Sequence, residues 1–386
     1  MKIFDFARKI KNEFFKYENS VEVFISEENL LHNLNEYKNK YKDISFAPVL
    51  KSNAYGHGLL EVAEILDKEN LPFFVVDSLY EARLLKLNSI KKDILIIGYT
   101  RLENIKIFNS SQFIFTVISL DELKNLSKNF SKKIRIHLKI DTGMHRQGIM
   151  INEIEEAMDI LKENKNFILE GICSHFADAD SQDKSFTESQ IENWKKVVEK
   201  FKNSFETIKY LHTSATAGSF YNQKDFGNVI RLGIGIYGVN TSPFSDLNLK
   251  PVMKIEAIIS SVRNLKKGES VGYGHTLTLE KDSKVATITM GYFEGVDRRL
   301  SNLAHFKIGN NFCKVLGRVS MNMSSIDVTD LDIKLEDKVI ILSEKKEDLN
   351  SLVNLAKLAN TIPYDILVHI MPHLKRKVLK SFNNIN

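Results

Sequence analysis

The sequence of 386 residues predicts a (β/α)8 barrel followed by a mostly β domain. Two observations predict the barrel. Short apolar, β-branched or aromatic runs recur between residues 28 and 240, and longer segments with helical spacing of their apolar residues separate them. The third observation is a change after residue 245, where short runs are joined by glycine and polar turns. Alternating strands and helices indicate a parallel sheet, and eight such units in about 210 residues match a barrel.

Eight runs are predicted to be the strands of the barrel. In chain order they are residues 46–50, 73–77, 94–98, 113–118, 134–140, 169–175, 209–213 and 229–234. Between them, segments such as 61–70 and 152–166 have the apolar periodicity of helices. A doubly wound sheet is the alternative, but the GxGxxG motif that usually follows its first strand is missing.

The predicted domains are an N-terminal extension (1–20), a barrel (21–244) and a mostly β domain (245–386). The strand-rich segments of the last domain are 254–279, 283–292, 306–321 and 337–343, and one helical segment follows at 347–359. The extension places Ile3, Ala7, Ile10 and Phe14 on one helical face. We expect that face to pack against the body of the protein rather than to contact a membrane loosely.

Composition excludes several classes of protein. The net charge of +5 is spread along the chain, and nothing resembles a nucleic-acid-binding stripe. Two distant cysteines, Cys173 and Cys313, predict neither a disulfide framework nor a zinc site, and they fit a reducing compartment. No apolar stretch has the length of a membrane span, and the N-terminus lacks the features of a signal peptide. We therefore expect a cytoplasmic protein that binds no metal, nucleic acid or membrane.

Polar residues gather at the predicted C-terminal ends of the barrel strands, which is where barrel enzymes have their active sites. They are Lys51, Lys139, Arg146, His175, Ser214 and Arg231. Taken alone, a lysine here is more often solvated, a histidine more often a hydrogen-bonded core residue, and a serine more often a helix cap. A buried arginine within an apolar strand needs partners, and the joint placement of these residues indicates a site.

The loops after the last two strands of such a barrel commonly hold a phosphate. Here they offer the hydroxyl of Ser214 and backbone N–H groups near Gly233 and Ile234. Lys51 follows the first strand and would face this cradle. A phosphorylated cofactor that forms a Schiff base with a lysine is pyridoxal phosphate, which makes it the candidate cofactor.

The motif "VLKSNAYGHG" at residues 49–58 resembles the cofactor-lysine signature of alanine racemases, which are barrel enzymes that use pyridoxal phosphate. The likeness extends in the family's order from about residue 21 to 376. It continues through "LKIDTGMHRQG", "SHFADAD", "HTSATA", "RLGIGIYG", "VGYGHT", "MGYFEGVDRRLSN" and "GRVSMNMSSIDVTD". This resemblance implies an isomerase that interconverts L- and D-alanine and supplies D-alanine for peptidoglycan. It also implies a homodimer whose active sites are shared between subunits.

The resemblance implies a role for each site residue. Lys51 would bind the cofactor and act as one base, and Tyr273, reaching the partner subunit, would be the second base. Arg231 would face the pyridine nitrogen, supported by His175. The phosphate would be held by Tyr55, Ser214, Ile234 and Tyr364, with Gly233 shaping the loop.

The remaining implied roles concern the substrate. Arg146 and the backbone of Met321 would bind its carboxylate, and Tyr292 and Tyr364 would narrow the entrance. Lys139 resembles a lysine that is carbamylated in some members, and the carbamate would orient Arg146.

Two positions depart from the family's pattern. Asn322 stands where the family usually has aspartate, and only Arg376 remains of a second arginine-and-proline motif. Other activities stay open at this point. A racemase for serine or lysine would keep the same catalytic set, and a non-catalytic barrel that binds pyridoxal phosphate would lack the second domain. A decarboxylase of the same barrel class ranks last, because no cysteine is placed as that family requires.

Overall fold

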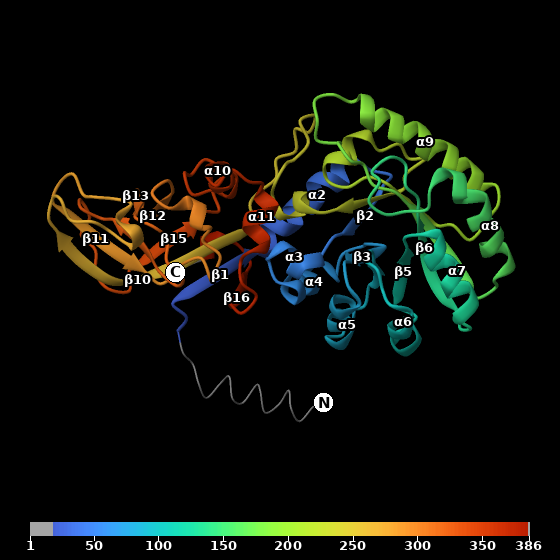
Figure 1. The fold of residues 1–386 in the computed structure, drawn as a ribbon, viewed down its shortest axis with the longest axis horizontal. Helices are drawn as coiled ribbons and strands as arrows, with labels where there is room; N and C mark the ends of the chain where they lie inside the picture. The colour runs from blue at the N-terminus through green and yellow to red at the C-terminus, as the bar shows by residue number, and fades with distance from the viewer. Residues whose placement is uncertain (1–17, 385–386) are drawn as a thin grey trace. The chain divides into compact units, whose positions relative to one another are not determined.

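The computed structural model describes residues 18–384, which form two compact units (Figure 1). One unit comprises residues 18–24, 254–362 and 369–377, and the other comprises 25–253, 363–368 and 378–384. The helical face predicted for Ile3, Ala7, Ile10 and Phe14 lies outside the described residues.

All eight runs predicted as barrel strands are strands, and every recorded pairing among them is parallel. They are β2 (Ser45–Pro48), β3 (Phe73–Val76), β4 (Asp93–Ile96), β5 (Phe113–Val117), β6 (Ile134–Lys139), β7 (Phe167–Cys173), β8 (Tyr210–His212) and β9 (Val229–Leu232). Strands β3 to β8 form a curled six-stranded sheet, and β2 pairs with β9. Flanking hydrogen bonds join the two sheets, from Leu50 N to Val75 O (2.7 Å) and from Asn228 N to Leu211 O (3.0 Å).

Helices α5 to α9 lie along the outer side of this curled sheet (Figure 1). The helices of this unit are α2 (Glu27–Lys40), α3 (Lys51–Tyr55), α4 (Leu59–Leu66), α5 (Leu79–Leu87), α6 (Leu102–Phe108), α7 (Leu120–Asn129), α8 (Ile154–Glu163), α9 (Ser185–Lys202) and α11 (Pro363–Val368). Their sequences explain them. In α7, for example, Ser119 caps the first turn by accepting from Glu122 N (3.2 Å), while Leu120, Leu123 and Leu126 form the buried face.

The connection between β8 and β9 differs from the other crossovers. It contains only the 3-10 helix η2 (Ala217–Tyr221), because its sequence is rich in serine, glycine and asparagine and lacks helical periodicity. After β9, a second 3-10 helix, η3 (Ile234–Tyr237), packs against α2. The side chain of Asn33 in α2 donates to Ile236 O (3.0 Å), so α2, which precedes the first barrel strand, supports the end of the last one.

The other unit is mostly β, as the sequence predicted. Its eight-stranded sheet has the order β11-β14-β13-β12-β15-β10-β1-β16. The strands are β1 (Val21–Ser26), β10 (Met253–Leu265), β11 (Ser283–Ile288), β12 (His305–Ile308), β13 (Asn311–Leu316), β14 (Ser324–Asp327), β15 (Lys338–Leu342) and β16 (Arg376–Leu379). Helix α10 (Leu352–Leu358) lies within the segment predicted as helical. Strands β1 and β16 were not predicted.

Candidate active site

Strand register brings several of the predicted site residues to neighbouring positions. Lys139 on β6 is paired with Cys173 on β7, and Cys173 is paired with His212 on β8. Arg231 on β9 is paired with Ala47 on β2, four residues before Lys51. Because residues in register on parallel strands point to the same face, these side chains share the inner face of the curled sheet near its C-terminal edge.

Lys51 opens a segment of unusual backbone. The four residues after it, Ser52, Asn53, Ala54 and Tyr55, have φ values between 52° and 56°, which makes one turn of left-handed helix. For residues other than glycine this conformation costs about 1–2 kcal/mol each, so the surrounding structure must impose it. A strained segment directly after a half-buried lysine indicates that the position of this lysine is functionally important.

Polar contacts hold the left-handed turn in place. The side chain of Asn53 accepts from Leu59 N (2.9 Å), and Glu81 accepts from Ser52 N (2.6 Å). The ring of His57 lies within 3.1 Å of two carbonyl oxygens of the turn, those of Ala54 and Tyr55. Residues of the motif itself, Asn53 and His57, and the distant Glu81 together hold the turn.

Arg231 is buried and surrounded by acceptors. Its guanidinium donates to the carbonyl oxygens of His212 (2.6 Å), Ser174 (2.8 Å) and Thr213 (3.0 Å). It also contacts ring nitrogens, Nδ1 of His212 at 2.6 Å and Nδ1 of His175 at 3.0 Å. No carboxylate is among these recorded partners within residues 18–384, so the cation is fixed in place without being neutralised by an acid.

The sequence reasoning missed two histidines that extend this network. Nε2 of His212 lies 2.8 Å from Nδ1 of His137, and both rings are fully buried. A guanidinium only donates, so Nδ1 of His212 accepts from Arg231, and its Nε2–H donates to His137. Burial lowers the pKa of His137 to about 3 and that of His212 well below its ordinary value, which keeps both rings neutral.

The proton positions leave one end of this network open. Nε2 of His137 must carry its proton, and it has no hydrogen-bond partner within the described part of the chain. Both histidines lie inside apolar runs, where a satisfied core histidine is the ordinary interpretation. The signal available in the sequence was the spacing of His212 and Ser214. They are two positions apart at the end of a predicted strand, so their side chains point to the same face.

Three tyrosines from distant segments pack together beside η3. The ring of Tyr55 lies 5.3 Å from that of Tyr237 and 5.8 Å from that of Tyr364, measured between centroids. Burial raises the pKa of both Tyr55 and Tyr364, so both hydroxyls keep their protons. Helix α11 thus brings Tyr364 to the turn that follows Lys51.

The loop at Gly233 and Ile234 has free hydrogen-bond donors. Within residues 18–384 no acceptor is recorded for the N–H of either residue, although Ile234 is fully buried. A Cβ on Gly233 would lie 3.0 Å from the hydroxyl of Tyr55, so a side chain at this position would obstruct the space in front of the loop. Two unpaired amides beside a tyrosine hydroxyl can bind a phosphate.

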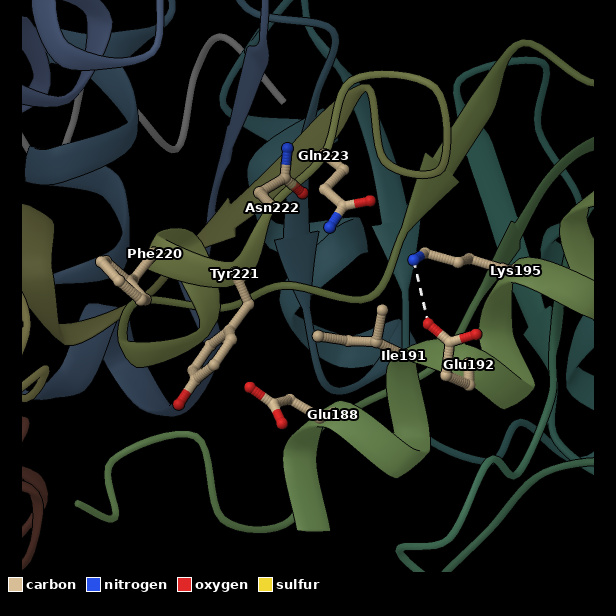
Figure 2. Close-up of a pocket in the computed structure, with 8 residues that line it drawn as sticks. All are labelled: Glu188, Ile191, Glu192, Lys195, Phe220, Tyr221, Asn222 and Gln223. Atoms are coloured by element: carbon tan, nitrogen blue, oxygen red, sulfur yellow. Dashed lines mark hydrogen bonds and ion pairs between the residues drawn. The ribbon is translucent and has the colours of Figure 1, made fainter. Parts of the chain in front are cut away.

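Ser214 is fully buried after β8, and its hydroxyl donates to Oδ1 of Asn222 (3.1 Å). Asn222 also lines a surface pocket of about 290 Å³ (Figure 2). That pocket is formed by Glu188, Ile191, Glu192, Lys195, Phe220, Tyr221, Asn222 and Gln223. It contains none of the predicted site residues, and its Lys195 and Glu192 are paired with each other at 2.9 Å.

Lys139 lies near two other cationic side chains, those of Arg146 and Arg231. Burial lowers the pKa of Lys139, and the charges of Arg146 and Arg231 lower it further, whereas Cys173 acts in the opposite direction. Arg146 itself is exposed on the loop after β6. Both cysteines, Cys173 and Cys313, are buried free thiols.

Three predicted site residues belong to the β unit and lie on its surface. Tyr273 is 70% exposed, Met321 56% and Tyr292 42%. Tyr292 and Met321 come from loops that contact each other, because Tyr292 N donates to Ser320 O (2.9 Å).

The barrel unit fits a phosphorylated aldehyde cofactor. It places a lysine without a recorded hydrogen bond or ion pair within residues 18–384 after one strand, unpaired amides after another, and a buried arginine that no acid neutralises. Fold and site together define the class, a barrel enzyme that binds pyridoxal phosphate.

Comparisons with known proteins identify the family. The model of the family "Alanine racemase, N-terminal domain" matches residues 25–241. The model of the family "Alanine racemase, C-terminal domain" matches residues 252–378. An alanine racemase of Borreliella burgdorferi is 33% identical over 371 residues, covering 92% of this chain and 96% of the relative. The chain belongs to the alanine racemase family.

Solved structures agree with this result. Alanine racemase from Clostridium difficile 630 superposes with a TM-score of 0.87 at 31% identity, over 94% of this chain and 97% of that one. A structure of alanine racemase from Bartonella henselae has the same fold, with a TM-score of 0.82 and 24% identity over 94% of this chain and all of that one. That structure contains covalently bound pyridoxal phosphate. This chain is a pyridoxal-phosphate-dependent enzyme that racemises alanine.

The C-terminal domain of the family matches this chain as well, and a barrel that only carries the cofactor would lack that domain. In the part of the chain that the structure describes, no helix is both long and apolar enough to cross a membrane.

Proposed function

We propose that racemisation proceeds through two bases, Lys51 on one face of the substrate and Tyr273 on the other. The observation that supports the role of Lys51 is the left-handed turn that directly follows it. Lys51 also lies near a partner of Arg231, because burial lowers the pKa of His175 and the charge of Lys51 is among those that lower it further. A chirality assay on a panel of L-amino acids, with pyridoxal phosphate added, tests the activity directly. Alanine should be racemised fastest, and a faster rate with serine or lysine would contradict the assignment.

When bound, pyridoxal phosphate delocalises the negative charge that develops when the Cα proton is removed. The residues of this chain move the protons and hold the cofactor. Nζ of Lys51 takes or returns the proton on its side, and the hydroxyl of Tyr273 does so on the other side. Ser214, Tyr55, Tyr364 and the amides at Gly233 and Ile234 hold the phosphate.

In the shared site of a dimer, Arg146 of one chain and the N–H of Met321 of the other would bind the substrate carboxylate. No acceptor for that N–H is recorded among residues 18–384. The lowered pKa of Lys139 favours its neutral amine, the form that can react with carbon dioxide to give a carbamate and a proton. A carbamate there would place a negative charge near the cations Arg146 and Arg231, and it would orient Arg146.

Larger-scale features follow from the same proposal. We infer that strands β2 to β9 close into a (β/α)8 barrel, which corresponds to the domain predicted at 21–244. We infer that the domain predicted at 245–386 is the β unit, which also takes in strand β1, and that residues 1–20 are an extension. We also infer a cytoplasmic homodimer that supplies D-alanine for peptidoglycan. The exposed Tyr273 and Met321 support the dimer, since a partner surface would cover them.

Arg231 should control which reaction follows proton removal. Its guanidinium contacts two histidines and no recorded carboxylate within residues 18–384, so a cofactor ring nitrogen held beside it would stay unprotonated and the electron sink would stay limited. Arg231→Glu should therefore slow racemisation and raise the share of the transamination product. The ratio of pyruvate to D-alanine measures this, with Arg231→Lys as the variant that keeps the charge and thermal unfolding as the check on folding. An unchanged ratio in a folded Arg231→Glu protein would show that the charge has no such role.

Tyr292 should limit the size of the substrate. Its side chain is 42% exposed beside Met321, where it would narrow the entrance. Tyr292→Ala should raise the turnover of lysine and arginine relative to alanine, because the space available to a long side chain increases. Tyr80→Ala, at an exposed tyrosine on helix α5, is the control. Equal relative turnover in both variants would exclude the gate.

A further inference from the structure

Two loops of the β unit are joined through their backbones. Tyr292 N donates to Ser320 O (2.9 Å) and Phe293 N donates to Met321 O (2.8 Å). The approach is so close that a Cβ on Gly291 would lie 2.3 Å from Ser320 O. The loop that carries Tyr292 and the loop that carries Met321 therefore move as one piece, and any group that fixes one fixes both.

Glu294 is the group at the centre of this junction. The residue is only 8% exposed, and its Oε2 accepts from Gly291 N (2.9 Å) within its own loop. Its Oε1 accepts from Nδ2 of Asn322 (2.6 Å) in the other loop. A buried carboxylate satisfied by two N–H donors is a strong constraint, because removing either donor leaves a desolvated charge.

We propose that Asn322 and Glu294 are positioning residues of the substrate site, a role that rests on the proposed function of Met321 and Tyr292. Asn322 directly follows Met321, and its side chain anchors that residue to the buried carboxylate. The Met321 carbonyl accepts from Phe293 N, which fixes this peptide segment. The Met321 N–H has no acceptor recorded in residues 18–384. The pair thus sets the direction of an amide that can bind the substrate carboxylate.

The geometry also explains the residue type at position 322. An aspartate there would place a second carboxylate within hydrogen-bond distance of Glu294, where the two groups repel each other unless the pair takes up a proton. The amide of Asn322 supplies that proton instead. In this chain the identity of residue 322 is therefore matched to that of residue 294, and an aspartate at position 322 should be tolerated only when residue 294 is an amide.

An exchange of the two side chains tests this inference. Asn322→Asp should raise the KM for L-alanine roughly tenfold with a smaller change in kcat, because a charged hydrogen bond is lost and the carboxylate-binding amide is displaced. Glu294→Gln should have a smaller effect, because the amide of Asn322 can turn to accept from the new amide. In the double variant the new amide at position 294 can accept from Gly291 N and donate to the new carboxylate at position 322, so the KM should return close to the wild-type value.

Hydrogen exchange of the peptide covering residues 290–296 gives a second readout that does not depend on activity. Asn322→Asp should accelerate exchange of the amides of Tyr292 and Phe293, and the double variant should restore their protection. Asn310→Asp, in the exposed turn between β12 and β13, adds the same charge elsewhere in the unit as a control.

The outcomes separate this inference from the proposed function. An inactive wild-type enzyme would overturn the proposed function. A wild-type KM and wild-type exchange in Asn322→Asp, or a double variant no better than that single variant, would overturn the positioning role while leaving the activity assignment intact.

Discussion

Lys51→Ala should abolish racemisation, with a loss of at least about 10²–10⁴-fold, because the same amine binds the cofactor and moves the proton. The variant should also lose the visible absorbance of the bound cofactor. In the wild-type enzyme, borohydride reduction followed by peptide mass analysis should place the cofactor on Lys51 and on no other lysine. The left-handed turn after Lys51 fixes the backbone from which this amine extends, so a neighbouring lysine cannot substitute for it.

Two comparisons make this result specific. Lys51→Arg keeps the charge and much of the volume but lacks an amine that can form the covalent link, so it should be as inactive as Lys51→Ala. Lys139→Ala should still bind the cofactor, because the proposed role of Lys139 concerns Arg146. Labelling at Lys139 or at any other lysine would show that the cofactor site has been misplaced.

The barrel could be predicted because its information is local. Each strand is a short apolar run, and parallel strands place their C-terminal ends at one edge, so Lys51, Ser214 and Arg231 could be expected near one another. The left-handed turn could not be predicted, because "SNAY" is an ordinary sequence on which Asn53, His57 and Glu81 impose the conformation. Strain of this kind depends on tertiary contacts that the sequence pattern does not contain.

The features that were missed depend on long-range pairing. Strand β1 lies between β10 and β16 in the sheet of the β unit, and nothing in the run "VEVFIS" shows which sheet it joins. His137 and His212 are 75 positions apart and have the appearance of core residues until the strand registers bring them together. Their role as hydrogen-bond partners becomes clear only when each donor and acceptor around Arg231 is assigned.

Co-expression of Lys51→Ala with Tyr273→Phe should restore activity that neither variant has alone. The bases lie on different units of the chain, and Tyr273, 70% exposed, is available to a partner. In a two-fold dimer with shared sites, each chain gives its tyrosine to the other. One site of the mixed dimer then lacks both bases, whereas the other site has the intact Lys51 of one chain and the intact Tyr273 of the other.

The expected yield follows from symmetry. Random pairing makes about half of the dimers mixed, each with one good site of two, so the mixture should recover about a quarter of wild-type activity. Mixed dimers isolated through two different tags should have about half of the wild-type activity per dimer. The homodimers of each variant, purified in parallel, provide the background, and thermal unfolding shows whether each variant is folded. If both bases came from one chain, every site of the mixed dimer would lack one of them, and isolated mixed dimers would be as inactive as the homodimers. That outcome would remove the shared site while leaving Lys51 as the cofactor residue, because the borohydride result does not depend on which chain supplies the tyrosine.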